Sequence, residues 1–303
     1  MISRFTHRTV SWIDLEEPTR DELSVIADEN NLHPVVTNEL FQKSERAKVD
    51  MYTNAIYLIL HFPIRNTKTG AITEAEIDFV LLKEKLITTH YELIEPLKDF
   101  AKQFEVGQYL DKNRIESHAG YLFFFAVREL YTHTLSVIEA TEKRLREAEK
   151  MMYSGREAEA VAQISLCNQT ISDIRHSIRY HKETLASLAS ACKQLYGEDF
   201  AYYVQAIEGE YLRVEKAIIE NRHMIKDLRK TNDSLLAAKN TKALERLTAI
   251  IVTLFPLGFL SWIFSMDSVY LQLNDPLMLG AVFATMAISV VLFVLYFRSK
   301  KWL

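Results

Sequence analysis

The sequence predicts an α/β N-terminal cytoplasmic domain, followed by a long α-helical stalk and two C-terminal transmembrane helices. Three observations predict this order: strand-like runs early in the chain, no proline from 97 to 255, and two long apolar runs near the C-terminus. Because proline costs about 3 kcal/mol inside a helix, a long stretch without it favours helix. The predicted segments are the α/β domain 1–115, the stalk 116–246, the transmembrane helices 247–266 and 276–297, the extracytoplasmic loop 267–275 and the basic cytoplasmic tail 298–303.

Two runs rich in β-branched and aromatic residues mark the α/β domain. Residues 55–62 (AIYLILHF) and 76–91 (EIDFVLLKEKLITTHY) are separated by the turn-like residues 63–73 (PIRNTKTGAIT), and together they predict a β-hairpin. The residues that follow Pro18 and the segment 34–45 are predicted to form short helices.

Glycines at 120, 155 and 197 divide the proline-free stretch into three helical blocks. In the last block, residues recur in alternating steps of four and three, a heptad pattern typical of coiled-coil packing between helices. This stalk stripe consists of Phe200, Val204, Ile207, Tyr211, Val214, Ile218, Asn221, Ile225, Leu228, Asn232 and Leu235. Asn221 and Asn232 are candidates for setting its register, and Gly209 lies off it. One helix is expected from about 199 to 266, because no helix breaker precedes the first apolar run.

The nine histidines are scattered along the chain. His176 and His181 are expected on one helix, five residues apart, which places them poorly for a shared metal. Both are predicted to be surface residues.

The two apolar runs have the length of membrane spans. Residues 247–266 and 276–297 contain 20 and 22 residues without a single Lys, Arg, Asp or Glu, and about 20 apolar residues cross the hydrocarbon core of a bilayer. The alternative is a buried helical hairpin in a large soluble core. Basic residues set the orientation of membrane helices, and here they precede the first run and follow the second: Lys239, Lys242, Arg246, Arg298, Lys300 and Lys301. A multi-pass protein of the cell membrane with both termini in the cytoplasm is therefore expected.

Charge and motifs exclude several other classes of protein. The chain carries 36 Lys and Arg against 40 Asp and Glu, a net charge of −4, which gives no argument for binding nucleic acid. Two cysteines among 303 residues exclude a disulfide scaffold. The sequence shows no glycine-rich phosphate loop, no G-x-S-x-G and no paired-carboxylate motif, so neither an enzyme nor a bound cofactor is predicted.

Short motifs spread over the chain resemble those of the CorA-type divalent metal-ion transporters, which move magnesium or cobalt. The matching residues are Trp12-Ile13-Asp14-Leu15 with Pro18, His33-Pro34, Lys48-Val49, Leu247-Thr248, Phe255-Pro256-Leu257 and the closing Lys300-Lys301-Trp302-Leu303. The resemblance implies a funnel-shaped homopentamer in the lipid bilayer, with the first span lining a central pore and the second span forming an outer ring. It further implies Mg2+ as the transported ion, with Co2+, Ni2+ or Zn2+ in some members. Intracellular Mg2+ bound between subunits is implied as a regulatory ion that holds the pore closed.

The resemblance also places individual residues in the pore. Leu244 and Leu247 match an apolar gate, where a ring of aliphatic side chains stops ions by dewetting; as an alternative, they are ordinary leucines in helix contacts. Ile251, Phe255, Gly258 and Trp262 continue this pore stripe, which is out of phase with the stalk stripe. Either the stalk stripe faces other helices, or the helix bundle shifts register near the membrane. Phe255 and Trp262 depart from the thioether and the glycine that are usual in the family, and Trp262 has the alternative of turning toward the second span or the headgroup boundary.

The mouth of the implied pore carries the largest departure. The family signature Gly-Met-Asn is replaced by Ser265-Met266-Asp267, so a ring of amides becomes a ring of carboxylates. We expect Asp267 to bind divalent ions transiently as an outer capture site, with less discrimination than an asparagine ring, because Mg2+ is often held through its hydration shell. The alternative is that Asp267 only caps a loop outside the bilayer.

Three functions follow from these expectations. The first is Mg2+ uptake driven by the membrane potential and gated by the cytoplasmic domain. The second is a Zn2+ or broad-specificity transporter similar to the ZntB branch, and the third is a non-conducting pentameric metal sensor or membrane anchor.

Overall fold

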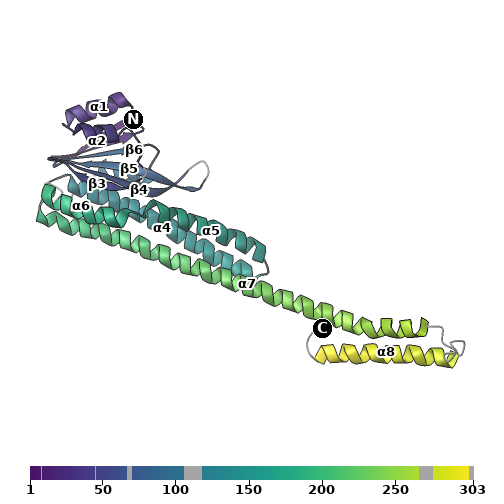
Figure 1. The fold of residues 1–303 in the computed structure, drawn as a ribbon. Coiled ribbons are helices and arrows are strands. Elements are labelled where there is room, and N and C mark those ends of the chain that lie inside the picture. Colours follow the sequence, from purple (N-terminus) through teal and green to yellow (C-terminus); the bar gives the residue numbers. More distant parts are fainter. Residues whose placement is uncertain (8, 45, 67–69, 106–117, 266–275, 300–303) are drawn as a thin grey trace. The chain divides into compact units, whose positions relative to one another are not determined.

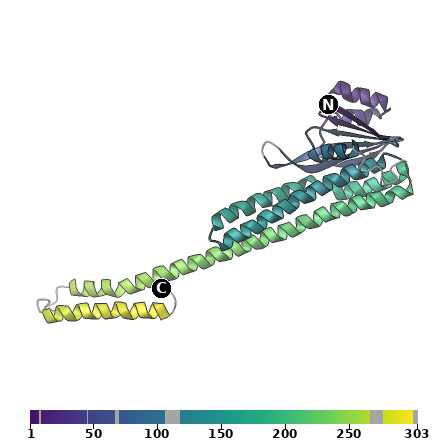
Figure 2. The same cartoon turned by 180° about the vertical axis from the view of Figure 1, so that it is seen from behind.

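The structure is a computed structural model that describes residues 1–7, 9–44, 46–66, 70–105, 118–265 and 276–299. The chain divides into two units, Met1–Leu228 and Arg229–Leu303. The first unit holds the sheet and most of the helices, and the second holds the end of one long helix together with the last helix (Figures 1 and 2).

Within the described residues, six strands form one sheet in the order β1-β2-β6-β5-β4-β3. Strands β2 and β6 run parallel, and all other neighbours are antiparallel. The strands are β1 (Ile2–His7), β2 (Val10–Glu16), β3 (Lys48–Met51), β4 (Ile56–Arg65), β5 (Ile72–Leu81) and β6 (Lys85–His90). The predicted hairpin is confirmed as β4 and β5.

The second half of that hairpin was predicted as one run over 76–91, and this was wrong. The run forms two antiparallel strands, β5 and β6, joined by a tight turn in which the N–H of Leu82 donates to the carbonyl of Lys85 at 2.9 Å. Lys83 and Glu84 are exposed at this turn. Two consecutive charged residues cannot continue a strand that is covered on both faces, so the chain reverses where they stand.

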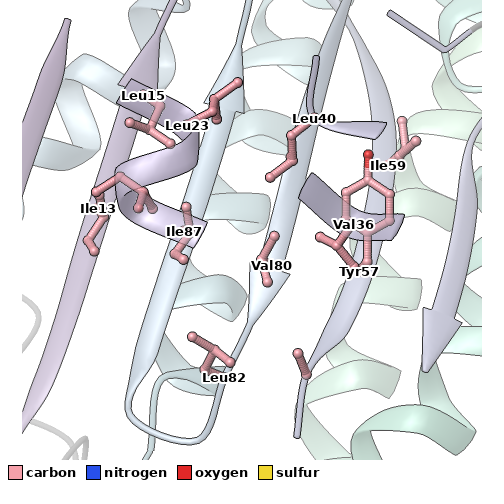
Figure 3. Close-up of a cluster of buried hydrophobic side chains, with 12 residues drawn as sticks. Ile13, Leu15, Leu23, Val36, Leu40, Tyr57, Ile59, Val80, Leu82 and Ile87 are labelled. Atoms are coloured by element: carbon pink, nitrogen blue, oxygen red, sulfur yellow. The ribbon is translucent and has the colours of Figure 1, made fainter. Parts of the chain in front are cut away.

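Helices cover both faces of the sheet (Figure 1). On one face, α1 (Arg20–Glu29) and α2 (Pro34–Glu39) confirm the predicted short helices, and Thr19 opens α1 with a capping box. Side chains from both helices pack on strand residues such as Ile13, Val80 and Ile87 (Figure 3). On the other face lie α4 (Gly120–Tyr153), α5 (Glu157–Ser177) and α6 (His181–Tyr196). Every residue of β4 from Ile56 to Ile64 is buried as a result.

Pro63 lies inside β4, although proline is rare in central strands. It pairs with Glu74 of β5, while the pairing of β4 with β3 already ends at Ile59. Proline lacks the N–H that a second neighbouring strand would need, so its place beyond the end of β3 accounts for its presence.

The glycines predicted to separate helical blocks lie at two of the three helix breaks. Gly155 and Gly197 have φ angles of 86° and 93°, which other residues rarely adopt, and they end α4 and α6. A third break, at 178–180 between α5 and α6, was not predicted, because no glycine or proline marks it. The remaining helices are α3 (Glu95–Glu105) and, after a short 3-10 turn at Glu198–Phe200, α7 (Ala201–Ser265).

The expectation of one long helix is confirmed by α7, which has 65 residues and passes through Gly209 without interruption. The stalk stripe is buried along its length except at Leu235, which is half-buried. Within the first unit it faces other helices of the same chain: the ring of Phe200 lies 5.8 Å from that of Tyr121 in α4, and Tyr211 lies close to Tyr131 in α4 and His181 in α6. For this part of α7, the stalk stripe is therefore out of phase with the pore stripe because it faces other helices.

The prediction for His176 and His181 was wrong on two points. The break at 178–180 places His176 at the end of α5 and His181 at the start of α6. His176 is exposed, but His181 is completely buried. Its Nε2 lies 2.8 Å from the carbonyl of His61 in β4, and its Nδ1 lies 2.6 Å from the hydroxyl of Tyr131 in α4.

In the second unit, α8 (Pro276–Ser299) runs alongside the end of α7 in both views (Figures 1 and 2). Taken over the residues that the structure describes, neither these two helices nor any other combines the length and apolar character needed to cross a membrane.

Candidate functional site

The residues predicted to line a pore share one face of α7. Leu244, Leu247, Ile251, Phe255, Gly258 and Trp262 follow one another in steps of three and four, which superimpose along a helix. The five large side chains among them are between 53% and 70% exposed in the single chain. Soluble surfaces rarely leave so much contiguous apolar area open unless it binds something.

The opposite face of α7 is covered. Ala249 is completely buried, and Val252, Thr253, Pro256 and Leu257 are half-buried. At about 100° per residue, Ile251 lies about 200° around the helix axis from Ala249. Because α8 runs alongside this part of α7 (Figures 1 and 2), the covered face is the one next to α8 and the pore stripe points away from it.

Proline gives this part of α7 a local weakness. Pro256 lies inside the helix and lacks the N–H that would otherwise bond to the carbonyl of Val252. The hydroxyl of Thr253 donates to the carbonyl of Ala249 at 2.7 Å and so does not replace the missing bond to Val252. Gly258 follows two residues later, so α7 can bend here at lower cost than elsewhere along the stripe.

The side chains of the two aromatic residues of the pore stripe are exposed. Phe255 is 70% exposed and Trp262 is 63% exposed. In the single chain the indole of Trp262 therefore lies on the pore stripe and is not packed on α8.

The predicted pore mouth falls at the limit of the described structure. Ser265 is the last residue of α7, and its side chain lies outside the described residues. Met266 and Asp267 lie outside them entirely, so the transient metal site predicted at Asp267 falls outside the described residues. Among the residues that are described, no group of three or more His, Cys, Asp or Glu side chains is arranged to hold a metal ion.

The motif at Trp12 and Asp14 forms a buried hydrogen-bonded network between β2 and β6. The indole N–H of Trp12 donates to the hydroxyl of Thr88 at 2.9 Å, and that hydroxyl donates to the carboxylate of Asp14. His90 Nε2 lies 3.3 Å from the Asp14 carboxylate, and its Nδ1 lies 2.7 Å from the carbonyl of Glu92. Burial alone would lower the pKa of His90, but the hydrogen bond and charge of Asp14 outweigh it and raise that pKa. The network joins the only parallel pair among the described strands, β2 and β6.

Two acidic residues of β5 form a second buried polar group. Glu76 is 6% exposed and accepts from the N–H of Ser44 at 2.7 Å, while its second oxygen has no partner. Asp78 is completely buried, and neither of its carboxylate oxygens has a hydrogen-bond partner. Burial raises the pKa of Glu76 to about 7, and burial together with the charge of Glu76 raises the pKa of Asp78 well above its usual value. Residues at i and i+2 of a strand share a face, so these two carboxyl groups oppose each other's ionisation.

Sequence reasoning missed both of these groups. Pairing of β2 with β6 joins residues that lie more than 70 positions apart, such as Asp14 and His90. For Glu76 and Asp78, the sequence did offer a sign of burial: both carboxylates stand between apolar residues of β5. On a strand that is covered on both faces, such carboxylates must be buried.

A family model described as CorA-like Mg2+ transporter protein matches residues 7–301 of this chain. The chain belongs to the CorA family. Members of the family are channel-type membrane transporters for divalent metal ions and not enzymes. The resemblance carried by the short motifs is thereby confirmed, whereas the altered signature Ser265-Met266-Asp267 is not tested by it.

Two comparisons support the family over nearly the whole chain. The Cobalt/magnesium transport protein CorA of Thermotoga maritima is 19% identical over 297 residues, which cover 97% of this chain and 84% of that protein. The complete structure of the CorA magnesium transporter from Methanocaldococcus jannaschii superimposes with a TM-score of 0.84 at 18% identity, covering 99% of this chain and 93% of the other. This confirms a CorA-like fold with an N-terminal α/β domain and a long helix.

A third comparison concerns the ZntB alternative. The cytoplasmic domain of ZntB from Vibrio parahaemolyticus superimposes with a TM-score of 0.54 at 11% identity, covering 78% of this chain and 90% of that domain. At this identity the likeness concerns the fold alone, so it does not choose between the magnesium and the zinc alternatives.

Proposed function

We propose that this chain is one subunit of a homopentameric channel in the cell membrane that takes up Mg2+. The pore stripe of α7 lines the channel in this proposal, residues 247–266 and 276–297 are the membrane spans, and both termini lie in the cytoplasm. The membrane potential favours entry of a divalent cation by about 4.6 kcal/mol per 100 mV, twice the value for a single charge.

The observation that carries the proposal is the open apolar face of α7. Leu244, Leu247 and Ile251 are more than half exposed, because they point away from the covered face around Ala249. An apolar stripe left open by its own chain is satisfied when copies of the same helix surround a common axis. In a monomer, only lipid could cover such a stripe.

Two rings of leucine form the gate in this arrangement. Leu244 and Leu247 would narrow the pore with aliphatic side chains, and water leaves an apolar constriction more readily than a polar one. Helix α7 runs without interruption from the first unit through both leucines. Movements of the cytoplasmic domain, including any caused by regulatory Mg2+ bound between subunits, would therefore reach the gate directly, and Pro256 would allow α7 to bend beyond the gate.

The pore mouth is proposed to consist of Ser265, Met266 and Asp267. Five carboxylates would concentrate cations there, and their mutual repulsion would raise some of their pKa values. We therefore expect weaker discrimination among Mg2+, Co2+ and Zn2+ than an amide ring would give.

Two alternatives remain distinct from Mg2+ uptake. A ZntB-like or broad-specificity transporter would use the same pore with a different order of ion preference. A non-conducting metal sensor or membrane anchor would assemble as the same pentamer but would not transport ions. The exposed indole of Trp262 favours this alternative, because five such rings would nearly fill a narrow pore.

Ion flux into proteoliposomes tests the proposal. Purified protein is reconstituted with an ion-sensitive dye inside, and Mg2+, Co2+ and Zn2+ are supplied separately, with and without an inside-negative potential. Potential-dependent Mg2+ flux supports the proposal, and faster Zn2+ than Mg2+ flux favours the ZntB-like alternative. If no ion crosses the membrane, even in the double variant Trp262→Gly and Asp267→Asn, both transport functions are excluded and the sensor or anchor is the remaining function.

Cysteine crosslinking tests the assembly independently of flux. The two native cysteines, Cys167 and Cys192, are buried and can be replaced by serine to clear the background. Leu247→Cys should then give disulfide-linked dimers on mild oxidation, whereas Ala249→Cys on the covered face should not. Equal crosslinking at both positions would contradict the proposed orientation of α7.

A further inference from the structure

A pocket of about 570 Å3 lies between the end of α5 and the first half of α7, and it is rich in arginine. Arg175 and Arg179 reach it from the region of the α5–α6 break, and Arg222 reaches it from α7. His176 also lines it, and Glu215 is the carboxylate among the lining residues. The pocket lies entirely within the first unit.

Within the described part of the chain, the positive charge of this pocket is only partly balanced: Glu74 lies 3.5 Å from His176 and lines an adjoining pocket with Arg179, whose guanidinium contacts His176. Among the described residues, no carboxylate forms an ion pair with Arg175, Arg179 or Arg222. The carboxylate of Glu215 accepts from the hydroxyl of Tyr211 at 3.1 Å. Counting three arginines against one glutamate gives the lining a formal charge of 3 − 1 = +2, although the whole chain carries −4.

Local helix electrostatics explain only part of this arrangement. Arg175 lies in the last turn of α5, where a cation complements the partial negative charge of the helix end. Arg222 has no such role, because it lies more than 20 residues inside α7. Helix-end electrostatics therefore do not account for the place of Arg222 beside the two other arginines of the pocket.

The floor of the pocket is apolar. Ile178, Tyr211 and Ile218 line it and are each at most 4% exposed. A volume of this size lies within the range of small-molecule sites, which combine an apolar lining with a few placed polar groups. Arginine in turn is the preferred partner of phosphate, because its planar guanidinium donates two parallel hydrogen bonds to the phosphate oxygens.

We propose that this pocket binds the phosphate chain of a nucleoside di- or triphosphate, with the nucleoside against the apolar floor. The arginines would hold the phosphates, and Ile178, Tyr211 and Ile218 would cover the base or the sugar. Such a ligand would bridge α5 and α7, the helix that carries the pore stripe. The binding itself does not depend on ion transport.

Calorimetric titration of the detergent-solubilised full-length protein tests the proposal. ATP and inorganic tripolyphosphate are titrated separately at low salt with EDTA present, so that no divalent ion bridges the ligand to the protein. We expect ATP to bind and to lose roughly tenfold in affinity in Arg222→Ala, equivalent to about 1.4 kcal/mol. Arg222 is exposed, so the variant is expected to fold.

A matched control lies on the same helix. Arg213 is also exposed on α7 but pairs with Glu210 at 3.2 Å and does not line the pocket, so Arg213→Ala should leave ATP affinity unchanged. Equal affinity for tripolyphosphate and ATP would remove the nucleoside from the proposal and leave a site for phosphate chains. No binding of either ligand at about 1 mM, or equal weakening by both variants, would overturn it, whatever the result of the flux experiment.

Discussion

Helix α7 carries apolar stripes in both of its halves, but the chain treats the two stripes differently. In the first half, Ile207, Val214 and Ile218 are at most 3% exposed, because α4 and α6 of the same chain cover this face. In the second half, Leu247 and Ile251 are 53% and 55% exposed. Similar residues at similar spacing are therefore core in one region and open surface in the other.

The comparison separates an apolar helix face that the single chain buries from one that it leaves exposed. A buried stripe stabilises the fold of the chain that contains it, by about 25 cal/mol for each Å2 removed from water. An open stripe stabilises nothing until lipid or another copy covers it. Mutations in the first half should therefore act on unfolding, and those in the second on assembly and conduction.

The largest effect is expected at His181, the buried residue that joins α6 to β4 and α4. His181→Ala would leave the carbonyl of His61 and the hydroxyl of Tyr131 without partners and would open a cavity, so we expect a loss of about 4 kcal/mol in unfolding free energy. Burial lowers the pKa of His181 to about 3, so the ring is neutral at ordinary pH. Urea-dependent thiol labelling of the buried Cys167 and Cys192 measures the loss. Tyr131→Phe, which removes one hydrogen bond and leaves the ring, should cost about 1–2 kcal/mol, and a loss below that in His181→Ala would contradict the assigned role.

A matched pair of isoleucines tests the comparison itself. Ile207→Ala deletes a completely buried side chain of the stalk stripe and should cost about 3 kcal/mol. Ile251→Ala removes the same atoms from the open pore stripe and should change the unfolding free energy of the first unit by less than about 0.5 kcal/mol. The same labelling experiment compares both variants. Equal losses would mean that the two halves of α7 do not differ as described.

The buried carboxyl groups of β5 predict a pH dependence confined to the first unit. The folded-state pKa of Glu76 is raised from 4.5 to about 7 by burial, so the folded state holds a proton that the unfolded state releases. Stability is therefore full below about pH 4.5 and declines as the pH rises to about 7, by up to about 3 kcal/mol. Glu76→Gln should make this decline shallower and stabilise the protein at pH 8, while Asp78, whose pKa burial also raises, keeps part of the decline. The exposed Glu84 provides the control Glu84→Gln, which should leave the pH profile of labelling unchanged; a profile equally steep in Glu76→Gln would exclude Glu76 as its source.

The sequence alone predicted the features that depend on local periodicity. The stalk stripe is buried and α7 is one helix, because residues in steps of three and four identify a helix face without knowledge of its partner. The strands around residues 55–91 followed in the same way from β-branched and aromatic runs. The break between α5 and α6 has no glycine or proline, so the burial of His181 could not be predicted.

Features that depend on distant pairing or on other chains could not be predicted. The contact of Asp14 with His90 requires the parallel pairing of β2 and β6, which no local pattern encodes. Periodicity places the pore stripe on one face of α7, and the structure places that face opposite Ala249. What the stripe faces is a property of the assembly, and for that reason its role rests on experiments with the whole oligomer.

The smallest effect is expected at two glycines, one in each half of α7, and it distinguishes the halves most sharply. A Cβ added at Gly209 or at Gly258 would meet no atom within 4 Å in the single chain, so alanine at either site should favour the helix by about 0.5–1 kcal/mol. For Gly209→Ala, thiol labelling should show that gain, because the stalk stripe in this half of α7 packs within the chain. Gly258 lies on the open stripe, where neighbouring copies would approach the backbone, so Gly258→Ala should reduce the oligomeric fraction on size-exclusion chromatography and slow ion flux. If Gly258→Ala leaves both assembly and flux unchanged, the open stripe faces lipid rather than a pore.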